Sequence, residues 1–140
     1  MAPAFEFEIG RTADVLTAAA RGPFDVAGFR RLLDAVSDAC PGPETTPVLV
    51  DITDVAPPHS DFDRFQVGSY AAEKIGRRAR IAVLWRAAYI NRLGENAAVN
   101  RGSISRVFDD RDAALAWLDG GATAPGTIVF SPRTRADLSR

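Results

Sequence analysis

Val48-Leu49-Val50-Asp51 and Ile81-Ala82-Val83-Leu84-Trp85 are the two stretches that decide how this chain folds. Each contains a continuous apolar run, which is typical of a strand that is buried on both faces in a parallel sheet. Helical patterns stand between these runs and on either side of them. Because strands that alternate with helices favour a parallel sheet, the sequence predicts an α/β fold.

Three helical patterns flank the two runs. The first extends from Asp25 to Cys40, where apolar residues recur at spacings of three and four. The second extends from about Asp61 to Ile75, with apolar residues from Phe62 onward roughly on one side. Gly76 follows it and suits the C-terminal cap. A third helix is expected from Tyr89 to about Val99.

The chain opens with two stretches that are expected to pair as a hairpin. Apolar and acidic residues alternate between Phe5 and Ile9, which predicts a strand with one solvent-exposed face. A second strand, Val15–Ala20, follows after a short link, so the two are predicted to be neighbours. With Ile104–Phe108 as the last strand, the prediction is a mixed, mostly parallel sheet with an N-terminal hairpin and four helices packed on it.

A single domain is predicted over residues 1–120. Asp109-Asp110 suits the start of its last helix, both as a cap and as charge that faces the helix dipole. That helix is expected to stop at Gly120-Gly121. Residues 121–140 are predicted to be a C-terminal tail, in which Ile128-Val129-Phe130 either adds a short strand or docks on the body.

Composition argues against several classes of function. The formal net charge of the 140 residues is −1, whereas a nucleic-acid binder needs a basic surplus, so no nucleic acid is expected as a partner. Cys40 is the only cysteine, which excludes an intramolecular disulfide and a cysteine-based zinc site. No stretch approaches the roughly 20 apolar residues of a membrane span. A secretory signal is absent from the start, so a cytoplasmic location is the default expectation.

Element order and two short motifs point to a known family. The strands Val48-Leu49-Val50-Asp51 and Arg80-Ile81-Ala82-Val83 follow the hairpin in an order that this family shares. Arg106-Val107-Phe108-Asp109-Asp110, followed by the segment 113–118, is similar to a stretch near the end of many members. In these features the sequence resembles the SpoIIAA-like (STAS-type) proteins of bacteria, over roughly Phe5 to Asp119.

The resemblance implies a STAS-type fold and a regulatory role through binding of partner proteins. Relatives are linked to control of anti-sigma factors, to transporter tails, and to small or lipid ligands. The first hypothesis is therefore a non-enzymatic interaction module that binds a protein partner or a second copy of itself. The alternative is a carrier of a small molecule or lipid, and a weaker alternative is a hydrolase. No cofactor is expected.

Ser60 is the serine that the resemblance brings into question. Phosphorylatable STAS members carry a serine just after the third strand, at the start of the next helix. Ser60 is the nearest candidate by position, but it comes later than expected and lacks the compact Asp-Ser-Ser-Gly type of loop. The resemblance therefore does not extend to phosphoregulation by the standard route.

Polar residues after the Val48–Val50 run form the first candidate site. Ligands of open α/β sheets bind beyond the carboxyl ends of strands, and the stretch Asp51–Ser60 is predicted to be a polar loop there. The candidates are Asp51, Asp54, His59, Ser60 and Asp61. They are interpreted as a ligand or partner surface, or more narrowly as an oxygen-and-imidazole metal site, although no metal is expected. The structural alternative is that Ser60 caps the next helix with Asp63, while the first two aspartates bond turn amides.

A second group of candidates follows the Ile81–Trp85 run. Arg86, with Arg92 or Arg101, is a candidate for holding an anion near a helix start. The rings of Trp85 and Tyr89 are candidates for lining a small pocket. The alternative is that the tryptophan is simply a core residue and the arginines are solvated.

Two tests separate the hypotheses. An interaction module predicts an exposed apolar patch without a deep cavity, whereas a carrier predicts an apolar pocket near Trp85, Tyr89 and the Asp51 loop. A hydrolase would have to use His59, the only histidine, within hydrogen-bond reach of Ser60. The sequence contains no G-x-S-x-G elbow and no nucleotide-binding glycine motif, so no catalytic residue is predicted.

Overall fold

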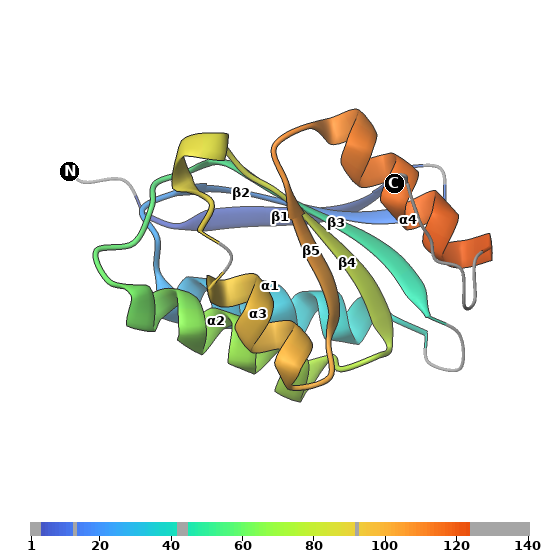
Figure 1. Cartoon of the computed structure of the whole chain (residues 1–140), viewed down its shortest axis with the longest axis horizontal. Helices are drawn as coiled ribbons and strands as arrows, with labels where there is room; N and C mark the ends of the chain where they lie inside the picture. The colour runs from blue at the N-terminus through green and yellow to red at the C-terminus, as the bar shows by residue number, and fades with distance from the viewer. Residues whose placement is uncertain (1–3, 13, 42–44, 92, 124–140) are drawn as a thin grey trace.

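Five strands form one mixed sheet in the order in which they occur along the chain (Figure 1). The computed structural model describes residues 4–12, 14–41, 45–91 and 93–123. Its strands are β1 (Glu6–Thr12), β2 (Val15–Gly22), β3 (Thr46–Val55), β4 (Ala79–Leu84) and β5 (Ile104–Phe108). β1 and β2 are antiparallel, and every later pair is parallel. The predicted hairpin and mostly parallel sheet are confirmed.

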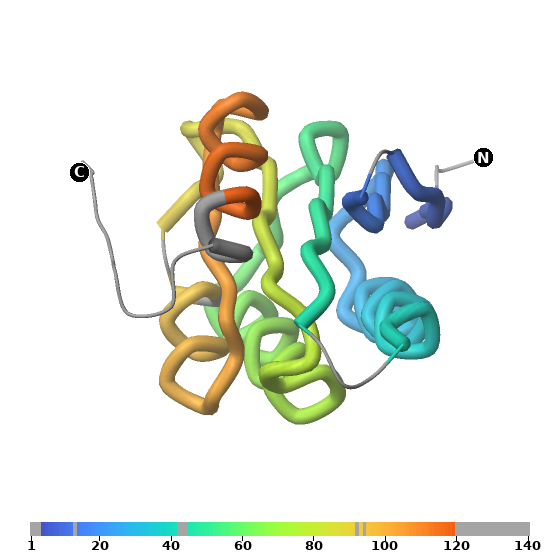
Figure 2. The backbone as a smooth tube through the Cα atoms, turned by 90° about the vertical axis from the view of Figure 1, so that its right-hand side faces the viewer, coloured from blue at the N-terminus to red at the C-terminus, as the bar shows by residue number. Residues whose placement is uncertain are grey.

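Four α-helices and one 3₁₀ turn connect and cover the strands. They are α1 (Val26–Ala39), α2 (Asp61–Lys74), η1 (Ala87–Tyr89), α3 (Leu93–Asn100) and α4 (Arg111–Thr123). Helices α1, α2 and α3 lie on one face of the sheet, and α4 lies on the other (Figures 1 and 2). Each new strand is added at the same edge of the sheet. Crossover connections of the same hand therefore place their helices on one face of it. Among the described helices, none has the length and apolarity to cross a membrane.

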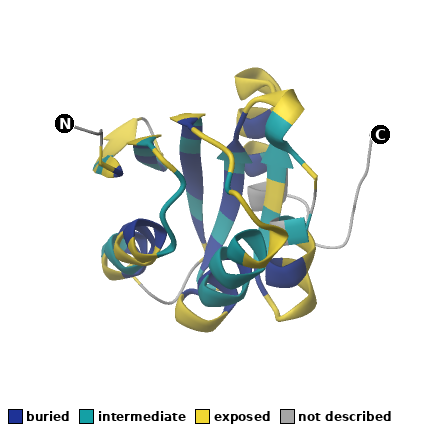
Figure 3. Cartoon of the chain, turned by 90° about the vertical axis from the view of Figure 1, so that its left-hand side faces the viewer, coloured by how far each residue is buried: buried dark blue, intermediate teal, exposed yellow. Residues whose placement is uncertain are grey.

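The alternation of side chains along β3 divides the core into two clusters. Val48, Val50 and Ile52 point into the larger cluster, against α1 and α2. Leu49 points the other way and packs with Leu118 of α4. Successive strand residues face opposite sides, so a sheet covered on both sides needs an unbroken apolar run. Figure 3 shows this burial along the strands, with exposed residues on the outward sides of the helices.

Two predicted boundaries near the candidate site were wrong. β3 continues to Val55, so half of the predicted loop Asp51–Ser60 is strand, because its polar side chains find partners beside the sheet. The predicted helix Tyr89–Val99 is divided into η1 and α3. Asn91 accepts a hydrogen bond from the backbone N–H of Leu93, which sets the start of α3.

The end of α4 also differs from the prediction. The helix passes through Gly120-Gly121 and ends at Thr123. A glycine lowers helix stability by about 1 kcal/mol relative to alanine but does not force a stop. Its start agrees with the prediction, since Asp110 accepts a hydrogen bond from the N–H of Ala113. The predicted strand Ile128-Val129-Phe130 lies outside the described residues.

A hydrogen bond between two side chains links α2 to α1. The Tyr70 hydroxyl donates to the Asp34 carboxylate over 2.6 Å. This bond raises the pKa of Tyr70, with smaller contributions from burial and from the negative charge of Asp34. Helix α2, which carries part of the candidate site, is therefore anchored through a polar contact as well as through its apolar side.

Replacing Leu118 by Ala is expected to destabilise the fold by about 2–5 kcal/mol. Leu118 is 1% exposed and holds α4 on the sheet, so the change leaves a cavity. Leu115→Ala, on the same helix at 36% exposure, is the control and should cost about 0.5 kcal/mol or less. Chemical denaturation measures both changes. Equal losses for the two variants would contradict this packing of α4.

Asp34→Asn is expected to lower the pKa of Tyr70. The chain has two tyrosines, so a Tyr89→Phe background lets the ultraviolet absorbance of phenolate report Tyr70 alone. Asp38→Asn, exposed on the same helix, is the control and should leave this pKa unchanged. Since the folded state raises the pKa, the stability gained from the neutral phenol is present at neutral pH and is lost at alkaline pH. A pKa that does not respond to Asp34→Asn would contradict the assignment.

Candidate functional site

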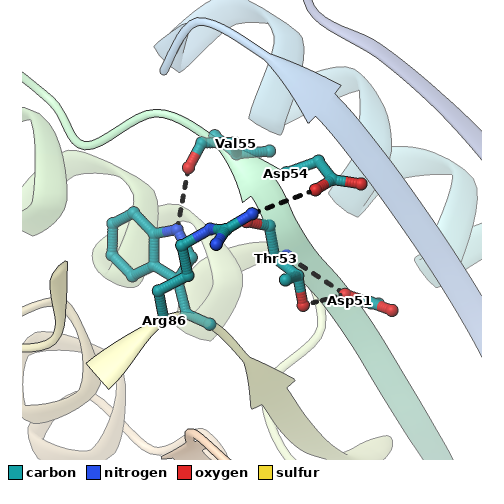
Figure 4. A network of polar contacts seen from close by, with 6 residues as sticks. Asp51, Thr53, Asp54, Val55 and Arg86 are labelled. Carbon is teal, nitrogen blue, oxygen red and sulfur yellow. Dashed lines mark hydrogen bonds and ion pairs between the residues drawn. The ribbon is translucent and has the colours of Figure 1, made fainter. Parts of the chain in front are cut away.

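The carboxyl ends of β3 and β4 bring two groups of predicted residues together (Figure 4). The Arg86 Nε donates to the carbonyl of Thr53 over 2.8 Å, and its Nη2 lies 3.4 Å from the Asp54 Oδ1. The Trp85 indole N–H donates to the carbonyl of Val55 over 2.9 Å. Arg86 and Trp85 therefore fasten the last residues of β3 to the segment that follows β4.

Trp85 is a core residue. It is 6% exposed, and its ring packs edge-to-face with the Tyr89 ring, with the ring centres 5.6 Å apart. The guanidinium of Arg64 lies over the indole, 5.0 Å from the ring centre. Trp85 and Tyr89 are thus adjacent, as the pocket hypothesis requires, while the burial of Trp85 agrees with the structural alternative.

Asp51 lies on the α4 side of the sheet and is bonded to the first residue of that helix. One carboxylate oxygen accepts hydrogen bonds from the N–H and the hydroxyl of Thr53, over 3.0 and 2.6 Å. The other accepts from Arg111 over 2.6 Å. The predicted grouping of Asp51 with the loop residues is therefore wrong. Alternation along β3 separates it from them, and its role is to hold α4.

The residues at the start of α2 act mainly on the helix itself. Ser60 accepts a hydrogen bond from the N–H of Asp63 over 3.4 Å, so the predicted cap is confirmed. Asp61 accepts from the Asn91 side chain over 3.0 Å and lies 3.7 Å from the Arg64 Nε. Asp61, the first residue of α2, therefore links this helix to the segment just before α3.

His59 is exposed and makes no hydrogen bond or ion pair with any residue in the described part of the chain. Within the same residues, Ser60 is bonded to the helix it caps rather than to His59. A serine nucleophile would need a base within hydrogen-bond reach. No set of three or more metal-binding side chains occurs among the described residues. The loop therefore has neither the pairing of a hydrolase nor the ligand set of a metal site.

The predicted arginine cluster is not assembled among the described residues. Arg86 is bonded to the end of β3, and Arg101 lies over the Phe65 ring, 5.0 Å from its centre. Arg92 lies outside the described residues. Arg86 and Arg101 therefore serve different contacts, and the pairing of Arg86 with Arg92 stays a prediction.

Arg64 is a residue that the sequence analysis missed. Its side chain is 13% exposed and donates to the carbonyl of Tyr89 over 2.6 Å. Burial lowers the pKa of this guanidinium, and the charge of Asp61 opposes that shift. The available signal was its position three residues after Asp61, which places both on one side of a helix. Arg64 thus joins α2 to the segment after β4.

Phe62 was predicted to lie on one side of α2 with the other apolar residues, but the core does not cover it there. Its side chain is 63% exposed. The ring is stacked on that of Phe65, with centres 6.3 Å apart and planes inclined by 17°. Together with Arg101, these two rings form a surface at the start of α2, here called the Phe62 surface. Helical periodicity placed the residue on the correct side but did not reveal that this side extends past the edge of the core.

An apolar cavity of about 120 Å³ lies between the sheet and helices α1, α2 and α3. Trp85 lines it, together with side chains of β3 such as Val50 and Ile52. Tyr89 and Asp51 are not among its lining residues. The pocket expected near Trp85 therefore exists, but it extends under the helices rather than toward the Asp51 side of the sheet.

Comparison with known proteins gives matches of structure. The chain is similar to an anti-sigma factor antagonist from Mycobacterium paratuberculosis, with a TM-score of 0.61 and 14% identity over 85% of this chain and 99% of the other. It is also similar to an uncharacterised DUF3478-family protein from Shewanella loihica PV-4, with a TM-score of 0.51 and 19% identity, covering 81% and 93%. The chain has a SpoIIAA-like fold. The sequence matches no family model and no curated protein.

The SpoIIAA-like fold confirms the resemblance drawn from element order and motifs. At 14% and 19% identity, the two structures show the fold alone, so residue roles have to come from this chain. Near the candidate residues of this chain, the distinctive exposed feature is the Phe62 surface. The polar candidates are mostly engaged in holding strands and helices together.

Trp85→Phe is expected to destabilise the domain by about 1–3 kcal/mol, because the buried carbonyl of Val55 loses its donor. Trp117→Phe is the matched control. This tryptophan is half-buried on α4, where its ring contacts Phe108 and Arg80. It should cause the smaller loss in chemical denaturation. A larger loss for the control would contradict the role assigned to the indole of Trp85.

Proposed function

We propose that this chain is a cytoplasmic, non-catalytic regulatory module that binds a protein partner through the Phe62 surface. The observation that carries the proposal is the 63% exposure of Phe62. The exposed ring of Phe62 and the half-buried ring of Phe65 form an apolar patch, and exposed apolar patches mark interaction sites. Aromatic residues and arginine are also the residue types that are enriched in interfaces.

The surroundings of Phe62 support this use. Phe65, in the same helix, stacks on the Phe62 ring, and Arg101 lies over Phe65. The exposed Phe62 ring is therefore held in place by its neighbours. A rigid aromatic anchor loses little conformational freedom when a partner covers it. Asp61 and the Ser60 cap fix the start of α2. The Phe62 surface therefore has an apolar centre with a polar margin, as interfaces do.

The fold supports a partner that is itself a protein. One structure that shares the SpoIIAA-like fold is described as an anti-sigma factor antagonist, a name that refers to action on another regulatory protein. The alternative of a small-molecule or lipid carrier is less well supported, because a cavity of about 120 Å³ is too small for a lipid or for a drug-sized ligand, whose pockets are typically roughly 300–1,000 Å³. The hydrolase alternative lacks a pairing between His59 and Ser60.

Photo-crosslinking tests the proposal. A benzophenone amino acid replaces Phe62 in the full chain, produced in the cells that naturally contain it. The expected result is one discrete adduct with a different protein, identified by mass spectrometry. The same probe at Leu115, which is exposed on the opposite side of the sheet, is the control and should give no such adduct.

Competition with unlabelled protein completes the test. As a competitor, the unlabelled chain carrying Leu115→Ala should suppress formation of the adduct to the same extent as the unmodified chain. Phe62→Ala should be at least about tenfold weaker as a competitor, since truncation of a central anchor costs about 2 kcal/mol or more. The proposal fails if position 62 gives no adduct, if it gives only an adduct of the chain with itself, or if Phe62→Ala competes normally.

A further inference from the structure

The cavity under the helices has a definite origin in the sequence. Helix α2 presents Gly68 and Ala71 to the sheet, and α3 presents Ala98. These residues have almost no side chain, while the facing strands carry Val and Ile. The space that larger helix residues would fill is left open, and about 120 Å³ remains between the two layers.

The lining determines what can occupy this space. Most of it is aliphatic or aromatic, from Phe29 and Leu32 of α1 to Ile81 and Val83 of β4. A water molecule there would find few partners, because a buried water needs two to four hydrogen bonds. The lining side chains of an empty cavity also lose dispersion contacts on one side. An apolar occupant would restore these contacts without any polar cost.

Charged groups among the lining residues are already bonded. Arg64 donates to the carbonyl of Tyr89. Glu95 accepts a hydrogen bond from the backbone N–H of Val107 over 2.9 Å. A ligand with a charged group would have to compete with these bonds, and it would meet charges of both signs. The residues therefore favour an uncharged ligand.

Size and access limit the ligand further. An engineered apolar cavity of about 150 Å³ binds benzene, so a volume of about 120 Å³ suits a molecule of roughly six non-hydrogen atoms. A lipid acyl chain is much larger than this. Asn91 lines the cavity and is also exposed, which gives a route to solvent at the start of α3.

We propose that the cavity between the sheet and helices α1, α2 and α3 is a binding site for a small, uncharged, apolar molecule of about the size of benzene. This site is separate from the Phe62 surface, and the two proposals can fail independently. Binding would stabilise the packing of α2 and α3 on the sheet, because only the folded chain has the cavity.

Benzene is the probe that tests the site, with methyl resonances of Val50, Ile52 and Ile81 as the readout. In the full chain, benzene should shift these resonances in a saturable manner and raise the melting temperature. Ala98→Leu fills the cavity and should weaken benzene binding at least about tenfold. Ala116→Leu makes the same change on the exposed side of α4, so it should bind benzene like the unmodified chain.

A second variant and a second probe keep the test decisive. If Ala98→Leu does not fold, Ala71→Val adds less volume in the same cavity and should also weaken binding. Palmitate, a charged lipid, should leave the cavity methyl groups unshifted. The proposal is overturned if benzene gives no saturable shift up to its solubility limit, if the cavity-filling variant binds it normally, or if palmitate binds at these methyl groups.

Discussion

The structure depends on the burial of β3 on all sides. This strand pairs with β2 along one edge and with β4 along the other, and helices cover both of its faces. Each side chain along it is therefore committed to one layer, so that Val50 belongs to the larger core and Asp51 to the contact with α4. A shift of one residue would exchange the two sets and place a carboxylate under α1 and α2.

The arrangement of strands bears on where a ligand crevice would be expected. In doubly wound sheets, the ligand crevice occurs where the strand order reverses. Here the order follows the chain from β1 to β5 without reversal. The ends of β3 and β4 meet as neighbours, and Arg86 joins them directly. The open space of the molecule lies instead between the layers, where α2 and α3 carry small residues.

Local pattern was sufficient for the elements of the fold and insufficient for the site. The Val48-Leu49-Val50 run and the alternation from Phe5 identified buried and half-buried strands, because the burial of a strand leaves a recognisable apolar pattern within a few consecutive residues. The exposure of Phe62 and the burial of Arg64 depend on where the start of α2 lies relative to the segment between β4 and α3, and periodicity does not carry that information. Asp51 was assigned to a loop because its stabilising partner, Arg111, is far along the chain.

The sequential strand order has a consequence for how the chain assembles. Every pairing in the sheet joins segments that are consecutive in the sequence, so no strand has to wait for a partner made much later. During synthesis, β3 can pair with the hairpin as soon as β3 itself has emerged, and each later strand extends the same edge. The growing sheet then has a single unfinished edge at each stage, which limits the time during which an unpaired strand is open to aggregation.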